Sequence, residues 1–386
     1  MMQDESVIRI KDLYLNFYTY DGVVKALDGV TLDLRKGEIL GLVGETGCGK
    51  SVTSLSTLSI VIPPGRIERG HVEFSVKNKA YDLLTLNDPT MARVRGRYIS
   101  MIFQEPRAAL NPVYTVGDQI SEVFLHHRRP ELIDAAIARL QKDLLKTSDL
   151  KKMIYKRELS LFNRMKNKPK SLVLRFALKI PLVRRFQNRL KTESKVFIVD
   201  ILKLLNIPDP GRVVNMYPHE LSGGMAQRAV IAMALSCNPM MLIADEPTTS
   251  LDVTVQAQIL LLIKDLQKRF GTSILYVTHD LGVVAQTCDR VAVMYAGNVV
   301  EIADVMSLFK KPLHPYTRAL LESIPRPGQK FVSIPGTVPS LVNPLPGCRF
   351  SDRCRYALEM CQTVKPELVE AEKNHFVACH LHDEGN

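Results

Sequence analysis

Short, uninterrupted apolar runs recur along this chain and predict strands that are buried on both faces. They cover residues 39–43, 240–244 and 274–277, and each is followed by a glycine or a polar residue. Apolar positions that alternate with other residues, at Leu13, Leu15 and Phe17, predict instead a strand with one buried face. Buried strands separated by stretches of helical periodicity, such as the small-residue stretch 226–234, predict an α/β fold.

The residues that follow the first buried run form a complete phosphate-binding loop. Its pattern is G-x-x-x-x-G-K-S, and its members are Gly44, Glu45, Thr46, Gly47, Cys48, Gly49, Lys50 and Ser51. The glycines let the backbone curl so that successive N–H groups point at an anion, and the helix that begins here adds its positive end. The lysine supplies a cation for the β- and γ-phosphates, and the serine hydroxyl is a ligand for Mg²⁺. The loop predicts binding of a nucleoside triphosphate.

A second anion-binding segment, Leu221-Ser222-Gly223-Gly224-Met225, lies far along the chain. A helix is predicted directly after it, so the N–H groups of Ser222, Gly223 and Gly224 are expected at a helix N-terminus. This LSGG segment resembles the signature of the ATP-binding cassette (ABC) ATPases, although Met225 stands where glutamine is most familiar. The resemblance implies that ATP is the nucleotide and that the protein forms a head-to-tail dimer, in which the signature of one subunit closes over the ATP held by the other.

The remaining ABC motifs occur in the expected order. The second buried run ends in Asp245, which is expected to hold the Mg²⁺ shell, and Glu246 follows as the candidate general base for the attacking water. His279, after the third run, resembles the switch histidine that contacts the γ-phosphate. Gln104 resembles the Q-loop glutamine that senses Mg²⁺ or water, and Asp252 belongs to a segment that resembles the D-loop at the dimer interface. Together these residues predict a hydrolysing ATPase.

The aromatic residue that stacks on adenine is expected near the end of the first strand. Phe17, Tyr18 and Tyr20 all qualify by position. The alternation of apolar residues places Phe17 towards the core, so we assign adenine stacking to Tyr20.

Length and composition fit a soluble motor subunit. The 386 residues allow two or three domains, and 46% of them are hydrophobic. No apolar run reaches the ~18–20 residues of a membrane span, and residues 1–6 do not resemble a secretory signal. Seven cysteines without an export signal favour a reducing compartment. We therefore expect a protein on the cytoplasmic side of the cell membrane, attached through partners.

The spacing of the motifs predicts an insertion over about residues 126–195. Gln104 and Ser222 are 118 positions apart, considerably more than ABC ATPases of this type commonly need. The inserted span carries 20 lysines and arginines against six acidic residues, a net charge of +14, whereas the whole chain carries +11. The basic character of the protein therefore belongs to the insertion.

Apolar residues of the insertion fall on one helical face at positions 172, 176, 180, 183 and 190. We favour a helical hairpin that packs on the cassette with its basic face in water, because charge runs are usually solvated. Contact with anionic lipid or a transmembrane partner is the second hypothesis, since basic amphipathic helices lie on membrane surfaces. Nucleic acid is disfavoured because no pattern of stacking aromatics accompanies the charge.

The C-terminal part, residues 311–386, narrows the resemblance to the ATPases of oligopeptide/dipeptide-type importers. It contains the segment HPYTRALL at 314–321, the run Ile334-Pro335-Gly336 and a set of four cysteines. The resemblance covers about residues 7–125 and 198–386. It implies an α/β P-loop NTPase fold with a RecA-like core, an antiparallel β subdomain and a helical subdomain, all within residues 1–310, followed by a C-terminal extension.

The four cysteines, Cys348, Cys354, Cys361 and Cys379, are spaced C-x₅-C-x₆-C-x₁₇-C. Structural zinc sites generally use tighter knuckles, whereas the ligand spacing of iron–sulfur clusters is variable. The family resemblance implies a [4Fe–4S] cluster, which would make the extension metal-binding. Zinc and reduced structural thiols are the alternatives.

The resemblance implies the ATPase subunit of an ABC importer for oligopeptides, dipeptides or related solutes such as oligosaccharides. The implied partners are a second, homologous ABC ATPase, two transmembrane permease subunits and an extracellular solute-binding protein. A non-transport ABC ATPase that acts on the ribosome or on nucleic acid through the basic insertion is the main alternative. A regulatory, non-hydrolysing subunit is disfavoured because Gln104, Glu246 and His279 are all present.

Overall fold

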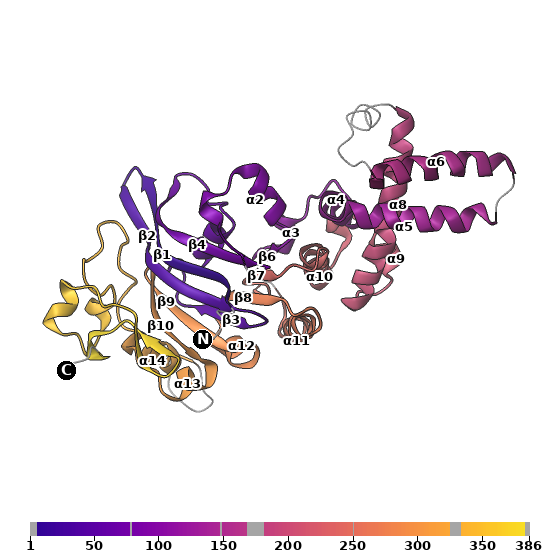
Figure 1. The fold of residues 1–386 in the computed structure, drawn as a ribbon. Coiled ribbons are helices and arrows are strands. Elements are labelled where there is room, and N and C mark those ends of the chain that lie inside the picture. The colour runs from indigo at the N-terminus through magenta and orange to yellow at the C-terminus, as the bar shows by residue number, and fades with distance from the viewer. Residues whose placement is uncertain are drawn as a thin grey trace.

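The protein contains two β-sheets that share a hydrophobic core, with helices on the outer side of the larger sheet and a helical arm at one end (Figure 1). The computed structural model describes residues 6–77, 79–146, 149–167, 181–249, 251–324 and 333–382. The predicted apolar face at 172, 176 and 180 lies outside these residues, and so does Ser250 beside the predicted D-loop.

The smaller sheet is antiparallel and has the order β2-β1-β4-β5. Its strands are β1 (Ser6–Thr19), β2 (Gly22–Arg35), β4 (Gly65–Val76) and β5 (Lys79–Asp82). Leu13 and Leu15 on β1 are fully buried, and Phe17 packs against the same core, as the alternation predicts. This sheet is the predicted antiparallel subdomain.

The larger sheet has the order β11-β12-β10-β9-β3-β8-β7-β6. Its strands are β3 (Ile39–Val43), β6 (Ile99–Ile102), β7 (Met241–Asp245), β8 (Ser273–Thr278), β9 (Arg290–Tyr295), β10 (Asn298–Asp304), β11 (Val369–Glu372) and β12 (His375–Val377). The strands β9, β3, β8, β7 and β6 are parallel, and every residue of β3, β7 and β8 is buried. The three apolar runs are therefore buried strands, and their carboxyl ends meet at one edge of the sheet.

Helices follow these strands and cover the larger sheet. They are α1 (Lys50–Thr57), α10 (Gly223–Leu235), α11 (Val253–Phe270), α12 (Leu281–Thr287), α13 (Val305–Lys310) and α14 (Pro315–Glu322). Asp252 caps the start of helix α11, because its Oδ1 accepts a hydrogen bond from the Val255 N–H at 3.0 Å, and Gly271, which has a φ of 64°, caps its end. The α/β fold predicted from the apolar pattern is confirmed.

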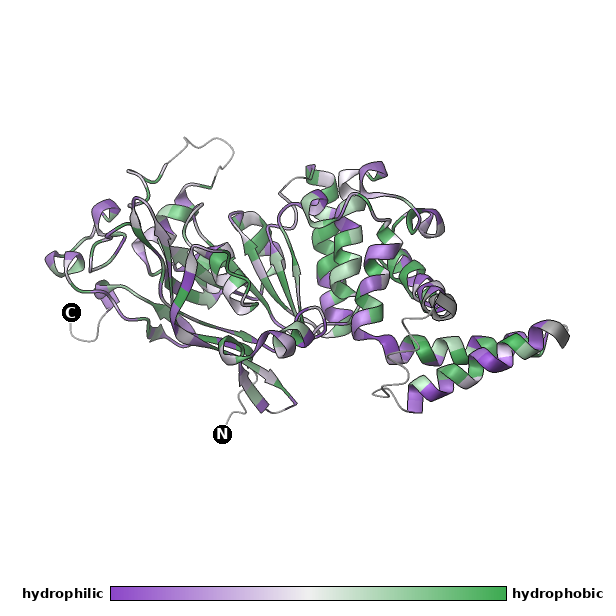
Figure 2. Ribbon diagram, turned by 90° about the horizontal axis from the view of Figure 1, so that it is seen from above, coloured by the Kyte–Doolittle hydropathy of each residue, from purple (hydrophilic) through white to green (hydrophobic). Residues whose placement is uncertain are grey.

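The remaining helices extend from the sheets towards one end of the molecule (Figure 1). Near the sheets lie α2 (Asp88–Val94), α3 (Pro106–Ala109) and α4 (Val116–His127); further out are α5 (Arg129–Leu144), α6 (Asp149–Asn167), α8 (Pro181–Leu204) and α9 (Pro210–Val213). Helices α5 and α6 lie side by side and project from the body, and Figure 2 shows apolar and polar residues on both. They fall within the predicted insertion, whereas α8 continues beyond it.

The C-terminal part adds β12 and β11 to the edge of the larger sheet and otherwise consists of loops and single turns. The turns are Ser351–Arg353, Glu359–Gln362 and His380–His382; similar turns occur earlier in the chain at Leu83–Thr85 and Pro218–Glu220. None of the helices in the described part of the chain combines the length and hydrophobicity of a membrane span.

Candidate ATP-binding and hydrolysis site

The phosphate loop connects β3 to α1 and has the backbone conformation that its glycines predict. Gly44, Gly47 and Gly49 have φ values of 155°, 81° and 104°, a region that side-chain-bearing residues rarely adopt. A Cβ added to Gly44 would lie 2.1 Å from the carbonyl oxygen of Met294, so no larger residue fits there without moving β9. The loop therefore has the curled backbone that a phosphate cradle requires.

Lys50 is buried at the start of α1 and spans the loop. Its Nζ donates hydrogen bonds to the carbonyl oxygens of Gly44 (2.8 Å) and Glu45 (3.1 Å). An ammonium group held against the loop in this way is placed to contact phosphate oxygens bound in the cradle.

Ser51 and Asp245 supply hard oxygen ligands at the same edge of the sheet. The Ser51 hydroxyl donates to Oδ1 of Asp245 at 3.2 Å, although 194 positions separate them. Burial raises the pKa of Asp245, while the hydrogen bond from Ser51 opposes the shift. A hydroxyl and a carboxylate side by side fit Mg²⁺, which is bound through oxygen together with substrate phosphates.

Glu246 is the centre of a polar cluster directly after β7. Its Oε2 accepts hydrogen bonds from Gln104 Nε2 (3.0 Å) and Thr249 Oγ1 (3.0 Å), and its Oε1 lies 3.0 Å from Nδ1 of His279. The chain thus brings together all three predicted catalytic residues, Gln104, Glu246 and His279, from the ends of three strands. Thr249 was not predicted, and its spacing of three residues from Glu246 is the signal that could have identified it.

The environment of Glu246 keeps its carboxylate ionised. Burial opposes ionisation, but the hydrogen bonds from His279 and Thr249 outweigh it and lower the pKa of Glu246. The residue also has a φ of 45°, a left-handed conformation that is uncommon outside glycine and clusters at functional sites. An ionised carboxylate beside a histidine suits a group that accepts a proton from water.

The signature segment lies at the start of α10, as predicted. Ser222 caps this helix, because its Oγ accepts a hydrogen bond from the Met225 N–H at 3.3 Å. A Cβ added to Gly224 would lie 2.9 Å from Cγ1 of Val255 on α11, so glycine permits close packing of the two helices. Gly223 is the first residue of α10, and Asp252 caps the start of α11. A Cβ added to Gly223 would lie 3.7 Å from Cδ2 of Leu251, so the signature lies beside the predicted D-loop segment.

An unpredicted ion pair ties the C-terminal part to the phosphate loop. The Arg353 guanidinium forms a bidentate pair with Glu45, at 2.8 Å to Oε2 and 3.2 Å to Oε1. The same arginine donates to the Tyr295 hydroxyl (3.1 Å) and the Pro335 carbonyl oxygen (2.7 Å). We call this arrangement the Arg353–Glu45 clamp, and the bonds with Glu45 raise the pKa of Arg353 further above its usual value.

The backbone of Glu45 is held from the same side. Its N–H donates to the hydroxyl oxygen of Tyr316 at 3.0 Å, and Tyr316 belongs to the HPYTRALL segment at the start of α14. Two parts of the C-terminal region therefore fix the second residue of the phosphate loop. No local pattern could reveal this contact, because Glu45 and Arg353 are 308 positions apart.

Tyr20, assigned to adenine, is fully exposed at the turn between β1 and β2. Tyr18 is 44% exposed and its hydroxyl donates to Glu68 Oε1 at 2.8 Å. Neither residue contacts the phosphate loop through a described hydrogen bond, and adenine stacking by Tyr20 stays a prediction.

The predicted metal centre in the extension is wrong. Cys348, Cys354, Cys361 and Cys379 line one cavity of only about 10 Å³. Nowhere in the described residues is a group of three or more His, Cys, Asp or Glu side chains arranged to hold a metal ion. Burial raises the pKa of the Cys348 thiol to about 11. Neither a [4Fe–4S] cluster nor zinc is supported, and the four residues are cysteines without disulfide bonds in a small core.

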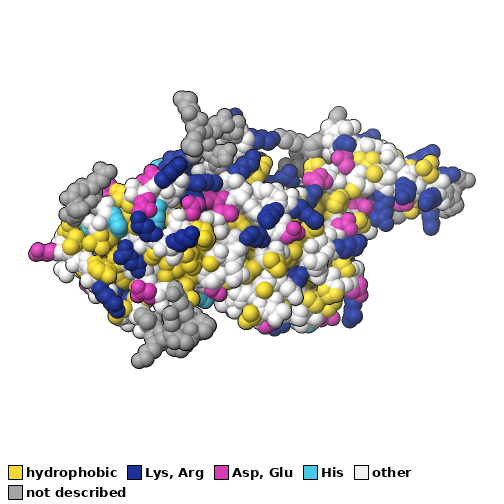
Figure 3. Space-filling view, turned by 90° about the horizontal axis from the view of Figure 1, so that it is seen from below, with side chains coloured by type: hydrophobic (Ala, Val, Ile, Leu, Met, Phe, Trp, Pro, Cys, Tyr) yellow, Lys and Arg dark blue, Asp and Glu magenta, His cyan; other side chains and the backbone are white. Residues whose placement is uncertain are grey.

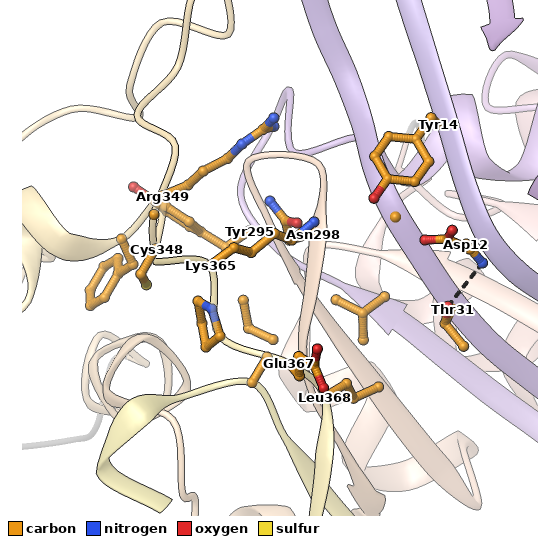
Figure 4. A pocket seen from close by; sticks show the side chains of 17 residues that line it. Asp12, Tyr14, Thr31, Tyr295, Asn298, Cys348, Arg349, Lys365, Glu367 and Leu368 are labelled. Atoms are coloured by element: carbon orange, nitrogen blue, oxygen red, sulfur yellow. Dashed lines mark hydrogen bonds between the residues drawn. The ribbon is translucent and has the colours of Figure 1, made fainter. Parts of the chain in front are cut away.

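A pocket of about 500 Å³ lies where the C-terminal part meets both sheets (Figure 4). Asp12, Tyr14 and Thr31 line it from the small sheet, and the Asp12 N–H donates to Thr31 Oγ1 at 3.0 Å. Arg349 and Lys365 line it from the C-terminal part. None of the residues predicted to bind ATP lines this pocket, so it is separate from the predicted hydrolysis site.

Comparison with known families gives two matches. Residues 27–249 match the family described as ABC transporter, and residues 300–361 match the family described as oligopeptide/dipeptide transporter, C-terminal region. The first match contains every residue predicted to act on the nucleotide except Tyr20, Asp252 and His279, and the second contains the HPYTRALL segment.

Similar proteins span nearly the whole chain. A probable peptide ABC transporter ATP-binding protein of Sinorhizobium fredii is 43% identical over 97% of this chain and 94% of its own length. The dipeptide transport ATP-binding protein of Bacillus subtilis is 42% identical (98% and 96%), and its oligopeptide counterpart in the same organism is 41% identical (98% and 89%).

Solved structures with this fold include a dimeric ATP-binding cassette with bound ADP and Pi. It is 21% identical, has a TM-score of 0.53, and the match covers 77% of this chain and 98% of that one. A cassette from Clostridium perfringens, part of another ABC transporter complex, gives a TM-score of 0.52 at 22% identity, with 80% and 92% coverage.

Proposed function

The chain belongs to the ABC transporter ATPase family, and on that premise we propose that it is the ATP-hydrolysing subunit of a peptide importer. The observation that carries the proposal is the meeting of the phosphate loop, Asp245 and the Gln104–Glu246–His279 cluster at one edge of the sheet. The match of the C-terminal part and the names of the full-length relatives favour peptides as the solute.

Each polar residue of the site has a role in this proposal. The loop N–H groups and Lys50 bind the triphosphate, and Ser51, Asp245 and Gln104 hold Mg²⁺, which neutralises phosphate charge when bound. Glu246 accepts a proton from the attacking water, and His279, hydrogen-bonded to it, orients the carboxylate and faces the γ-phosphate.

A second ATPase chain completes the site. The N–H groups of the Ser222 segment lie at the start of α10 and form a second anion site, separate from the phosphate loop between β3 and α1. The signature therefore serves the ATP of a partner, and the partner's signature serves ATP held here. We propose that the partner is a different, homologous ATPase, with Asp252 at the interface.

The transmembrane path is supplied by other chains. We propose two permease subunits and an extracellular solute-binding protein as partners, with this chain at the cytoplasmic face of the membrane. ATP-driven closing of the dimer reaches the permeases through the segment that follows Gln104.

Purification of the complex from membranes tests the assignment. We expect two distinct permeases and a second ATPase, and hydrolysis that rises when peptide-loaded binding protein is added to the reconstituted complex. Recovery of ribosomal RNA without permeases would favour the non-transport alternative. Two copies of this chain with no other ATPase would contradict the heterodimer.

A further inference from the structure

Helices α5 and α6 form a projecting arm, and apolar side chains pack between the two helices. Leu132, Ala136 and Leu140 on α5 are fully buried, and so is Phe162 on α6. The two helices extend beyond the body of the protein in both ribbon views (Figures 1 and 2). Since this packing already stabilises the pair, residues near its far end are available for another role.

Three large apolar side chains are exposed at that far end. Leu145, which directly follows α5, is 87% exposed, while Met153 and Ile154 in the first turns of α6 are 59% and 38% exposed. We call these residues and the cations around them the hairpin tip. Single exposed apolar residues are ordinary, but three together at the end of a projecting arm are typical of a contact surface.

Cations surround these apolar side chains. Lys146, Lys151, Lys156 and Arg157 are exposed, and the last two lie one helical turn beyond Met153. Figure 3 shows Lys and Arg side chains next to apolar ones along the projecting helices, with fewer acidic side chains between them.

Two acidic residues near the tip whose side chains are described, Asp143 and Glu158, pair with an arginine of another helix. The carboxylates of Asp143 and Glu158 lie 3.1 Å and 2.9 Å from the guanidinium of Arg189, which comes from α8. Their charge is therefore balanced inside the arm, and the described tip presents a positive surface.

We propose that the hairpin tip docks on the surface of a membrane that contains anionic lipids. Cations attracted to lipid headgroups, with apolar side chains that enter the boundary of the acyl chains, form the usual arrangement of an interfacial anchor. Nucleic acid would pair with the cations but leaves the apolar trio in water, and the trio contains no aromatic ring for stacking. The inference goes beyond the proposed import function, because the tip shares no residue with the ATP site.

Vesicle binding by the purified full-length chain tests the proposal. One vesicle preparation contains phosphatidylcholine only, and in the other roughly a third of the lipid is phosphatidylglycerol. We expect sedimentation with the anionic vesicles only, and loss of binding as salt is raised. The triple variant Lys146→Gln, Lys151→Gln, Lys156→Gln should bind on the order of a hundredfold more weakly, since each cation near such a surface contributes roughly fivefold.

A second variant separates apolar insertion from charge. Leu145→Gln with Met153→Gln should weaken binding by about tenfold and leave its salt dependence unchanged. The matched controls are Lys36→Gln, Lys268→Gln and Lys373→Gln for charge, and Met306→Gln for the apolar change; all four residues are exposed elsewhere on the molecule.

Several results would overturn the proposal. These are equal binding to both vesicle types, binding to neither, or tip and control variants that lose binding alike. RNA that binds more tightly than the anionic vesicles and displaces them would assign the tip to nucleic acid instead. Nucleotide binding by each variant is measured in parallel, so a failure of the docking proposal is distinct from a failure of the ATPase assignment.

Discussion

Replacement of Arg353 by glutamine should weaken ATP binding, although Arg353 lies outside every nucleotide motif. The substitution removes both charge-assisted bonds of the Arg353–Glu45 clamp and leaves a carboxylate in the phosphate loop without its counter-ion. An unpaired negative charge in this loop disfavours a bound triphosphate, and the loop itself loses a restraint.

The exposure of the two partners sets the expected size of the effect. The Arg353 side chain is 6% exposed and that of Glu45 is 25% exposed. Removal of one partner of a fully buried pair costs roughly 3–5 kcal/mol, whereas an exposed pair contributes less than about 1 kcal/mol. For this intermediate pair we take about 2 kcal/mol, which is roughly thirtyfold in the equilibrium between clamped and unclamped loops. Since apparent affinity falls with the competent fraction, we expect ATP affinity to fall about tenfold, and thirtyfold at most.

The assay is nucleotide binding by the purified chain, followed by KM and kcat for ATP in the assembled transporter. KM should rise and kcat should stay within about twofold, because the clamp does not touch Glu246 or His279. Arg353→Lys retains the charge but not the bidentate geometry, so it should lie between wild type and Arg353→Gln. Arg355→Gln, an exposed arginine two positions away, is the matched control.

A double-mutant cycle decides whether the effect is due to the pair. Addition of Glu45→Gln to Arg353→Gln should recover part of the lost ATP affinity, because it removes the carboxylate that Arg353→Gln leaves unpaired. Additive losses, or a folded Arg353→Gln protein with unchanged ATP affinity, would refute the reasoning.

Three further experiments examine the site and its support. Glu246→Gln should lower kcat by about 10²–10⁴-fold and retain ATP binding, whereas Lys50→Ala should weaken binding itself; near-normal turnover by the first variant would identify another carboxylate as the base. Thr249→Val removes one of the bonds that lower the pKa of Glu246, so the acid limb of the pH–kcat profile should move to higher pH, and an unmoved limb would contradict that assignment. Glu301 is fully buried and its pKa is lowered from 4.5, because bonds from His375 and from two backbone N–H groups outweigh the effect of burial. Glu301→Gln should therefore cost about 3 kcal/mol of unfolding free energy at neutral pH. A depressed pKa stabilises the fold above about pH 4.5 and ceases to do so as the pH falls through the folded value, so wild-type and variant melting temperatures should converge in acid.

The edge of the sheet where Gly44, Glu246 and His279 meet could be predicted because parallel strands expose their carboxyl ends together. The information is local: each of three buried apolar runs is followed, within two positions, by a residue of the predicted site. The projecting helices could be located only as an excess of residues between two motifs. Spacing shows that something is inserted, but the direction in which it projects depends on packing against α8.

Contacts between distant segments could not be predicted in this way. The Arg353–Glu45 clamp joins a loop-rich segment to the phosphate loop, and nothing in the residues around either partner identifies the other. The cysteine prediction failed for a related reason. The sequence shows that four thiols are available as ligands in one segment. Metal binding also requires their sulfur atoms to converge on one point, and the spacing of the cysteines does not determine whether they do.

Helix α8 connects the arm mechanically to the helices around α10. Its 24 residues span about 36 Å; it contacts the arm through Arg189 and Glu193, and it also packs against α4, α9 and α10. Because one continuous rod joins the two regions, a small rotation of the helices around α10 becomes a larger displacement at the hairpin tip. A tip held on a surface would act as a fixed pivot and resist that rotation. The arm would then work as a lever that couples the tilt of the protein on its support to the movements of the signature helix.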